Sequence, residues 1–208
     1  MELPHHKQFQ DMIHFILHIF FTIIYAYLSI TIFYIFIVSI AGFFNRRKSY
    51  AINPDKKRIA VLITSYKEDN IIINTIKQAT THNYPEAFYK VFLAADHLQP
   101  GTIFELRKFN ATIVSLINEK SSKARSLNNL LNSIDEEQFD IAIILDGDNI
   151  MMPGFMEKIN AAFQNGYRAV QGHRTAKNKN SAVAVLDALS EEVNNHLFRK
   201  AQRALGFS

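Results

Sequence analysis

IAIILDGDN, residues 141–149, is the most informative segment of the sequence. Five apolar residues, 141–145, run directly into two aspartates, Asp146 and Asp148, with a single glycine between them. A run of this length without a polar side predicts a β-strand that is covered on both faces of a sheet. A carboxylate at the end of such a strand is costly unless it has a partner. The two aspartates are therefore the first candidates for a functional site.

Strand-like and helix-like segments alternate along the chain after residue 58. Short apolar runs predict strands, and apolar residues spaced three and four apart predict helices. Besides 141–145, we expect strands at 58–64, 90–95, 112–116 and 169–173, and helices at 70–82, 101–109, 123–132, 155–165 and 181–205. This alternation is typical of an α/β domain with a mainly parallel sheet and helices on both faces.

The N-terminal part contains a long apolar segment. Residues 13–44 include no Asp, Glu, Lys or Arg. As a helix they would be about 48 Å long, and the hydrocarbon core of a bilayer is about 30 Å thick. We therefore expect one transmembrane helix. A buried core helix is the alternative, and a cleaved signal peptide is disfavoured because the apolar run is too long and no basic region precedes it.

A basic segment follows this apolar run directly. Residues 45–58 carry six basic residues and one acidic residue, so the positive-inside rule places the following domain in the cytoplasm. The sequence thus predicts a single-pass protein of the plasma (inner) membrane, with the lipid bilayer as a partner. Its expected parts are an N-terminal tail (1–12), the transmembrane helix (13–44), a basic juxtamembrane linker (45–58) and the main domain (59–208).

Composition argues against two other classes of protein. The chain has no cysteine, which excludes a disulfide scaffold and any cysteine-ligated zinc site. Residues 59–208 contain equal numbers of basic and acidic residues. A basic face for nucleic acid is therefore not favoured, and we expect no nucleic-acid partner.

Carboxylates follow three of the expected strands. Glu68 and Asp69 come after the first strand, Asp96 after the second, and Asp146 and Asp148 after 141–145. Because ligands bind at the carboxyl ends of strands in open α/β sheets, these groups point to one shared site. Like charges repel unless a cation lies between them, and Mg²⁺ or Mn²⁺ with oxygen ligands fits that position. Asp69 and Asp96 have an ordinary alternative as helix-cap or turn residues.

Asp-x-Asp after a buried strand occurs in several families. An EF-hand loop starting at Asp146 would place Glu157 correctly at its twelfth position, but it would put Ile150 and Met151 where an oxygen ligand and a glycine are needed. Phosphatases of the haloacid dehalogenase type place the motif on their first strand, whereas here it follows a late strand. That phosphohydrolase class remains a weaker alternative.

Four motifs resemble, in order, those of family 2 glycosyltransferases: RIAVLITSYKED, VFLAADH, KARSLNNLL and IAIILDGDN. The resemblance covers about 59–208 and is strongest to membrane-linked enzymes related to cellulose, chitin and hyaluronan synthases. It implies a GT-A, Rossmann-like fold and a metal-dependent, inverting transfer of sugar to a polysaccharide or glycan acceptor. The expected donor is a nucleotide-diphosphate sugar, UDP-sugar in the first place.

The resemblance also assigns roles to individual residues. Asp148 would bind the metal directly, while Asp146 would lie near the ribose or sugar and serve as a second candidate ligand. Nucleotide binding is expected from Thr64, Ser65, Tyr66, Glu68, Asp96 and Lys123, with Asp96 on the uracil or ribose side and Lys123 near the diphosphate. This chain departs from the family's Lys-Gly-x-Ala-Leu-Asn pattern at two positions, with Ala124 in place of the Gly and Ser126 in place of the Ala. Lys123 also has an ordinary alternative as an exposed lysine at a helix start.

The acceptor side of the family pattern is not found. In the family, the general base lies in an acidic pair that comes after the motifs named above. The Gln-x-x-Arg-Trp motif of processive members is absent here because the chain has no Trp. The pair Glu191–Glu192 is expected on the solvated side of a helix, and Arg174 is equally consistent with a surface role. We therefore expect an incomplete GT-A domain with no assigned catalytic base. There are two alternatives. A partner chain could supply the acceptor half, or the chain could be a nucleotide-sugar-binding fragment without transferase activity.

Overall fold

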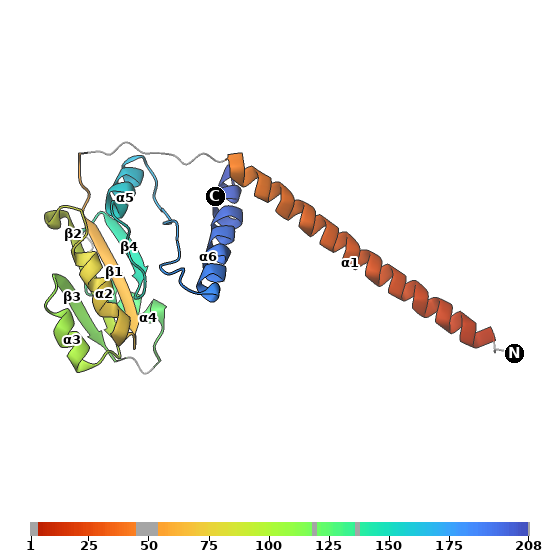
Figure 1. The fold of residues 1–208 in the computed structure, drawn as a ribbon, viewed down its shortest axis with the longest axis horizontal. Coiled ribbons are helices and arrows are strands. Elements are labelled where there is room, and N and C mark those ends of the chain that lie inside the picture. The colour runs from red at the N-terminus through yellow and green to blue at the C-terminus, as the bar shows by residue number, and fades with distance from the viewer. Residues whose placement is uncertain (1–3, 45–53, 118–119, 136–137, 208) are drawn as a thin grey trace. The chain divides into compact units, whose positions relative to one another are not determined.

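A computed structural model describes residues 4–44, 54–117, 120–135 and 138–207. Contacts divide the chain into two compact units, residues 49–170 and residues 1–48 together with 171–208. The sheet lies wholly in the 49–170 unit, and the long N-terminal helix belongs to the other (Figure 1).

The 49–170 unit is built on a parallel sheet of four strands in the order β3-β2-β1-β4. The strands are β1 (Ile59–Tyr66), β2 (Tyr89–Asp96), β3 (Ala111–Leu116) and β4 (Ile141–Asp146). In the register, Thr64 of β1 is opposite Asp146 of β4, and Tyr66 of β1 is opposite Asp96 of β2. Because all strands run the same way, their polar carboxyl ends meet at one edge of the sheet, as the sequence predicts.

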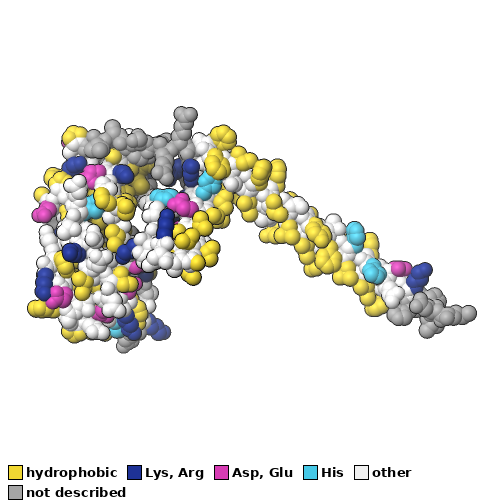
Figure 2. Space-filling view, in the orientation of Figure 1, with side chains coloured by type: hydrophobic (Ala, Val, Ile, Leu, Met, Phe, Trp, Pro, Cys, Tyr) yellow, Lys and Arg dark blue, Asp and Glu magenta, His cyan; other side chains and the backbone are white. Residues whose placement is uncertain are grey.

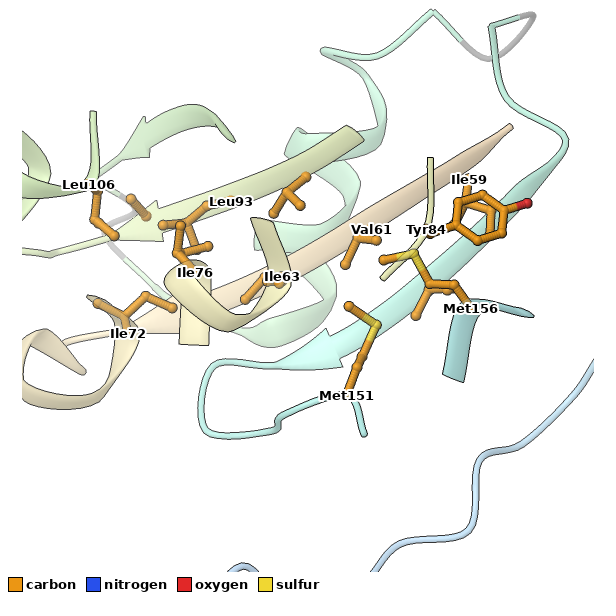
Figure 3. Close-up of a cluster of buried hydrophobic side chains, with 14 of the residues drawn as sticks. Ile59, Val61, Ile63, Ile72, Ile76, Tyr84, Leu93, Leu106, Met151 and Met156 are labelled. Atoms are coloured by element: carbon orange, nitrogen blue, oxygen red, sulfur yellow. The ribbon is translucent and has the colours of Figure 1, made fainter. Parts of the chain in front are cut away.

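Helices cover the sheet on both faces, which confirms the expected α/β architecture. Side chains alternate across a strand, so Val61 and Ile63 enter one apolar cluster while Leu62 enters the other. The larger cluster contains Ile72 and Ile76 of α2 (Figure 3). The smaller cluster is closed by Leu130 of α4. β1 is therefore buried from Ile59 to Ser65, as a central parallel strand should be.

The helices of this unit begin and end close to the predicted boundaries. They are α2 (Asp69–Thr80), the short 3₁₀ helix η1 (Glu86–Phe88), α3 (Pro100–Leu106), α4 (Lys123–Leu131) and α5 (Phe155–Gln164). Ser122 caps α4, since its side chain accepts a hydrogen bond from the backbone N–H of Arg125 at 3.2 Å.

β4 differs from its prediction. The expectation that both faces are covered is wrong: Ile141 and Ile143 are buried, but Ala142 is exposed and Ile144 is 52 % exposed. β4 forms an edge of the sheet, and α4 lies against β1 and β2. An all-apolar run predicts a strand, but it does not predict whether a helix covers the second face of that strand.

The strand expected at 169–173 is also not formed. Residues 167–180, which come after α5 and the turn at 165–166, have no regular secondary structure. A strand needs a neighbour for its backbone hydrogen bonds, and β4 pairs with β1 alone within the described residues. The apolar content of this segment was therefore not sufficient for a strand.

In the other unit, α1 (Pro4–Phe44) is a continuous helix of 41 residues, about 60 Å long. It begins before the predicted position 13. The span from Lys7 to Phe44 contains an 18-residue stretch with a mean hydropathy of 2.3, and it is long and apolar enough to cross a bilayer. Its hydrophobic side chains are exposed along the helix, unlike those of a buried core helix (Figure 2). The basic residues Arg46, Arg47 and Lys48 of the predicted linker lie outside the described residues.

The predicted helix at 181–205 is divided into three parts. These are α6 (Ala182–Asn194), a π-helical segment η3 (Asn195–Ala201) and α7 (Gln202–Ala204). η3 and α7 pack on the end of α1: His196 Nε2 lies 2.9 Å from the carbonyl of Ser39, and a Cβ on Gly42 would stand 3.2 Å from that of Ala201. Glu192 on α6 is exposed and accepts a hydrogen bond from His173 at 2.9 Å, consistent with a solvated side chain.

Candidate functional site

The predicted site residues lie at the carboxyl edge of the sheet, but they form two separate groups of contacts. One group surrounds Asp96 at the end of β2. The other surrounds Asp146 at the end of β4. β1 lies between them: Tyr66 at its end is on the side of the first group, and Glu68, the N-cap residue of α2, is on the side of the second.

The Asp96 carboxylate is completely buried and fully supplied with donors. Ser126 of α4 donates to its Oδ2 at 3.1 Å, and the hydroxyl of Ser121 donates to the same oxygen. His97 Nδ1 lies 2.7 Å from Oδ1. Hydrogen bonds of this kind offset the cost of a buried charge, and they attach α4 to the sheet. The unexpected serine at position 126 is thereby explained.

Asp96 is therefore held inside the described chain by these hydrogen bonds, and its contact with a nucleotide stays a prediction. The more exposed groups beside it are Tyr66 and His97, whose rings meet edge to face with centroids 5.6 Å apart. Tyr66 is 47 % exposed, and Lys67 Nζ lies 5.0 Å from its ring centre. These rings offer flat apolar surface at the end of β1 and β2.

Two residues that follow these strands have an unusual backbone. Lys67 has φ = 54° and His97 has φ = 55°, in the left-handed region that favours glycine. Each conformation costs roughly 1 kcal/mol. Both are held by hydrogen bonds across the sheet edge, Lys67 N–H to the Asp96 carbonyl at 3.2 Å and His97 N–H to the Leu116 carbonyl at 3.1 Å. Such strained turns are concentrated at functional sites.

At the end of β4, Asp146 forms an ion pair with Lys123, the first residue of α4. The other carboxylate oxygen of Asp146 accepts a hydrogen bond from the side chain of Asn149 at 3.2 Å. Lys123 is exposed, as expected for a lysine at a helix start, but its ammonium group also contacts Asp146 of the predicted site. The structure therefore brings together two of the residues that the sequence singled out.

Glu68 and Gly147 form a third close contact. Ser65 donates to Glu68 Oε2 at 2.9 Å, and this carboxylate oxygen lies where a Cβ of residue 147 would stand. The carbonyl of Thr64 would be 3.2 Å from the same Cβ. The position between the two aspartates thus has room for glycine alone as the structure stands.

Asp148 is exposed, and its carboxylate makes no hydrogen bond or ion pair within the described residues. The expected cluster of three carboxylates is not formed: the described residues contain no group of three His, Cys, Asp or Glu side chains placed to hold a metal. Asp69 instead accepts a hydrogen bond from the Gln99 N–H at 2.8 Å. Hydrogen bonds from Thr102 and Gln99 lower the pKa of Asp69.

A divalent cation at this site would thus depend on Asp146 and Asp148. That donor set fits Mg²⁺ or Mn²⁺, because Mg²⁺ is usually held by one or two carboxylates while water and substrate phosphates complete its coordination. Oxygen ligands also suit Mn²⁺. The exposed Asp148 carboxylate, which has no partner in the described part of the chain, is available for such a bond.

Several contact residues were not predicted from the sequence. Ser121, Asn149, His97 and Thr75 all take part in the hydrogen bonds at or behind this edge. A sequence signal existed for Thr75, which is a polar residue on the apolar face of α2 between Ile72 and Ile76. His97 and Asn149 bond to aspartates one and three residues away in the sequence. Ser121 bonds to Asp96, 25 residues earlier, and that contact depends on how loops meet, which residue spacing does not reveal.

Residues 54–208 match the family model described as glycosyltransferase-like family 2. No curated protein matches the chain. Among solved structures, the chain is similar to the mannosyltransferase PcManGT of Pyrobaculum calidifontis, in complex with GDP-Man and Mn²⁺. The identity is 19 %, the TM-score is 0.51, and the match covers 65 % of this chain and 41 % of that one.

A second solved structure, S. aureus TarS 1–349, matches with 15 % identity and a TM-score of 0.44, over 58 % of this chain and 40 % of that one. The chain thus spans less than half the length of either structure. At these identities the likeness to PcManGT shows the fold.

Proposed function

The chain belongs to the glycosyltransferase-like family 2 and has a GT-A fold, and we propose that its carboxyl sheet edge binds a nucleotide-diphosphate sugar with a divalent cation, for transfer of the sugar to a glycan acceptor. The observation that carries the proposal is the Lys123–Asp146 ion pair, two residues from the exposed Asp148, which has no ion-pair partner among the described residues. This arrangement offers both signs of charge at one strand end.

The charges suit a diphosphate. Without a donor, the ammonium group of Lys123 is balanced by Asp146. A diphosphate entering the site offers Lys123 a second anionic partner, and Asp146 is then free to turn toward the ribose or the cation. When bound, the cation stabilises negative charge on the departing diphosphate as a Lewis acid. Lys123 would add a positive charge on the same side, and Asp148 would hold the cation directly.

The nucleoside would lie toward β1 and β2. Tyr66 presents a half-exposed ring and His97 lies against its edge, so a base can stack or pack there. UDP-sugar is the donor we expect first. The donor in the PcManGT complex is GDP-mannose, so UDP and GDP should be compared directly.

Transfer with inversion also needs a base that deprotonates the acceptor hydroxyl. We assign no such residue in this chain, and we propose that the acceptor side belongs to a longer protein or to a partner chain. A binding fragment without transfer is the remaining alternative. Release of UDP from a UDP-sugar only when acceptor is present would favour transfer, whereas tight binding without release would favour the fragment.

We also propose that α1 anchors the domain in the plasma (inner) membrane, with the sheet in the cytoplasm. The support is the exposed apolar surface and length of α1, together with the basic composition of residues 45–58. The full chain should then stay with membranes during alkaline carbonate extraction. Its release into the soluble fraction would contradict the anchor but would leave the donor site untouched.

The donor site is tested by calorimetry on the full chain in detergent, with UDP or GDP and with or without Mn²⁺ or Mg²⁺. We expect binding that requires the cation and that is at least about tenfold weaker in Asp148→Ala. Asp187→Ala, which removes an exposed carboxylate from α6, is the matched control and should bind like wild type. Equal binding without the cation would contradict the proposal. Hydrolysis of a simple phosphomonoester would instead support the phosphohydrolase alternative.

A further inference from the structure

We propose that Thr75 is a positioning residue for the Asp146-Gly147-Asp148 loop, because its hydroxyl fixes the carbonyl group between the two aspartates. The inference rests on the proposed function, since a cation and a sugar donor are what this loop would serve. Thr75 lies on α2, 72 residues earlier in the chain than Gly147.

The geometry of the contact is that of a buried, well-formed hydrogen bond. Thr75 is 1 % exposed, and its Oγ1 donates to the Gly147 carbonyl at 2.7 Å. A threonine inside a helix commonly bonds to the carbonyl four residues earlier. Here that carbonyl, on Ile71, is 3.5 Å away, at the outer limit for a hydrogen bond. The hydroxyl is thus directed to the loop and away from its own helix.

The same helix also holds the far end of the loop. His82, just beyond α2, has Nε2 at 3.0 Å from the carbonyl of Met152, and its ring is buried. Met151 enters the large apolar cluster beside α2 (Figure 3). The two ends of the 147–152 segment are therefore attached to α2 and to the residue that follows its C-cap.

Fixing the Gly147 carbonyl has a direct effect on Asp148. The carbonyl of Gly147 and the N–H of Asp148 belong to one planar peptide group, so the hydrogen bond sets the orientation of that plane. The Asp146 carbonyl accepts the Asn149 N–H at 3.1 Å, which closes the turn around the same peptide. Together these bonds determine the direction in which the Asp148 side chain leaves the backbone. Outer partners that orient metal ligands typically change metal affinity by about 10–100-fold when removed.

The test compares three variants of the full chain in detergent. Thr75→Val keeps the shape and removes the hydroxyl, whereas Thr75→Ser keeps the hydroxyl. Thr80→Val makes the same chemical change elsewhere on α2, where the hydroxyl bonds to the Ile76 carbonyl at 2.9 Å within the helix. If Thr75→Val does not fold, Thr75→Cys replaces it, because a thiol is a weak donor of similar size.

Two quantities are measured: the Mn²⁺-dependent affinity for UDP and GDP, and the amide hydrogen exchange of residues 146–152 without metal. We expect Thr75→Val to bind about tenfold more weakly. Its loop amides should exchange about tenfold faster, as the loss of one hydrogen bond implies. Thr75→Ser and Thr80→Val should match wild type in both measurements.

Unchanged exchange and affinity in Thr75→Val would overturn the inference, and so would an equal loss in Thr80→Val. If the wild-type chain binds neither nucleotide with Mn²⁺, the proposed function fails instead. The exchange measurement then decides separately whether Thr75 holds the loop.

Discussion

The carboxylate of Glu68 lies over Gly147, at the place that a Cβ of residue 147 would occupy. The hydroxyl of Ser65 holds it there with a hydrogen bond of 2.9 Å. Two elements separated in sequence, the end of β1 and the loop after β4, are thereby in direct contact. A side chain on residue 147 would displace this carboxylate.

Gly147→Ala should displace Glu68 and weaken donor binding without unfolding the domain. The clashing atom is the end of a flexible side chain, so the cost is mainly the lost Ser65–Glu68 hydrogen bond, about 1 kcal/mol. Urea unfolding and calorimetry with UDP and Mn²⁺ measure the two effects. Glu68→Ala removes the obstacle, so adding Gly147→Ala to Glu68→Ala should cost little further stability. An equal cost in both backgrounds would show that Glu68 is not the obstacle.

Lys123→Met should reduce the affinity for the metal–nucleotide complex while leaving stability almost unchanged. The Lys123–Asp146 pair is largely exposed, and such pairs contribute at most about 1 kcal/mol. A lost contact to the diphosphate should cost about tenfold or more in affinity. Lys123→Arg keeps the charge and should retain most of the binding. Undiminished affinity in Lys123→Met would show that Lys123 is an ordinary exposed lysine at the start of α4 and does not contact the donor.

Ser126→Ala should destabilise the domain through Asp96. It removes a donor from a buried carboxylate, which costs about 1–2 kcal/mol in urea unfolding. A double-mutant cycle with Asp96→Asn isolates the contact, since the cost of Ser126→Ala should fall when the charge is absent. Additive effects in the cycle would mean that Ser126 does not stabilise the Asp96 charge.

Acid should weaken the domain partly through Asp140 at the opposite edge of the sheet. Hydrogen bonds from the Arg58 side chain and backbone lower the pKa of Asp140. A carboxylate with a lowered folded-state pKa contributes stability above its unfolded-state pKa and loses it as pH falls through the folded-state value. The loss should be about 0.5 kcal/mol, because the pair is substantially exposed.

The measurement for Asp140 is the urea midpoint at pH 7 and at about pH 3. Wild type should lose more stability between these values than Asp140→Asn, which carries no titrating carboxyl group at this position. Equal losses in the two proteins would show that the Arg58–Asp140 pair does not contribute to the acid sensitivity.

The four strands of the sheet were predictable from the sequence, because each depends on a local apolar pattern. The apolar runs ending at Tyr66, Asp96 and Asp146 form the parallel strands that the sequence predicts, and their carboxyl ends share one edge. The helices follow from three- and four-residue spacing. The strand expected at 169–173 was wrong because a strand needs a partner, and pairing is a property of the whole sheet.

The chemistry of individual carboxylates was less predictable. Asp69, Asp96 and Asp146 all lie at or just after the end of a strand, yet their partners differ. Asp69 accepts a hydrogen bond from the backbone at the start of α3, Asp96 from two serines, and Asp146 pairs with a lysine. Which donor reaches each carboxylate depends on loops that meet in three dimensions. The Thr75–Gly147 hydrogen bond is of the same kind, because only the polar residue on an apolar helix face was visible in the sequence.

Paramagnetic broadening by Mn²⁺ is the sharpest test of whether a divalent cation binds beside Asp148. In spectra of the labelled full chain in detergent with UDP present, we expect the amide signals of Gly147, Asp148 and Asn149 to be lost first. The same signals should survive in Asp148→Ala. Broadening centred on another part of the chain, or unchanged broadening in Asp148→Ala, would show that the cation does not bind at Asp148.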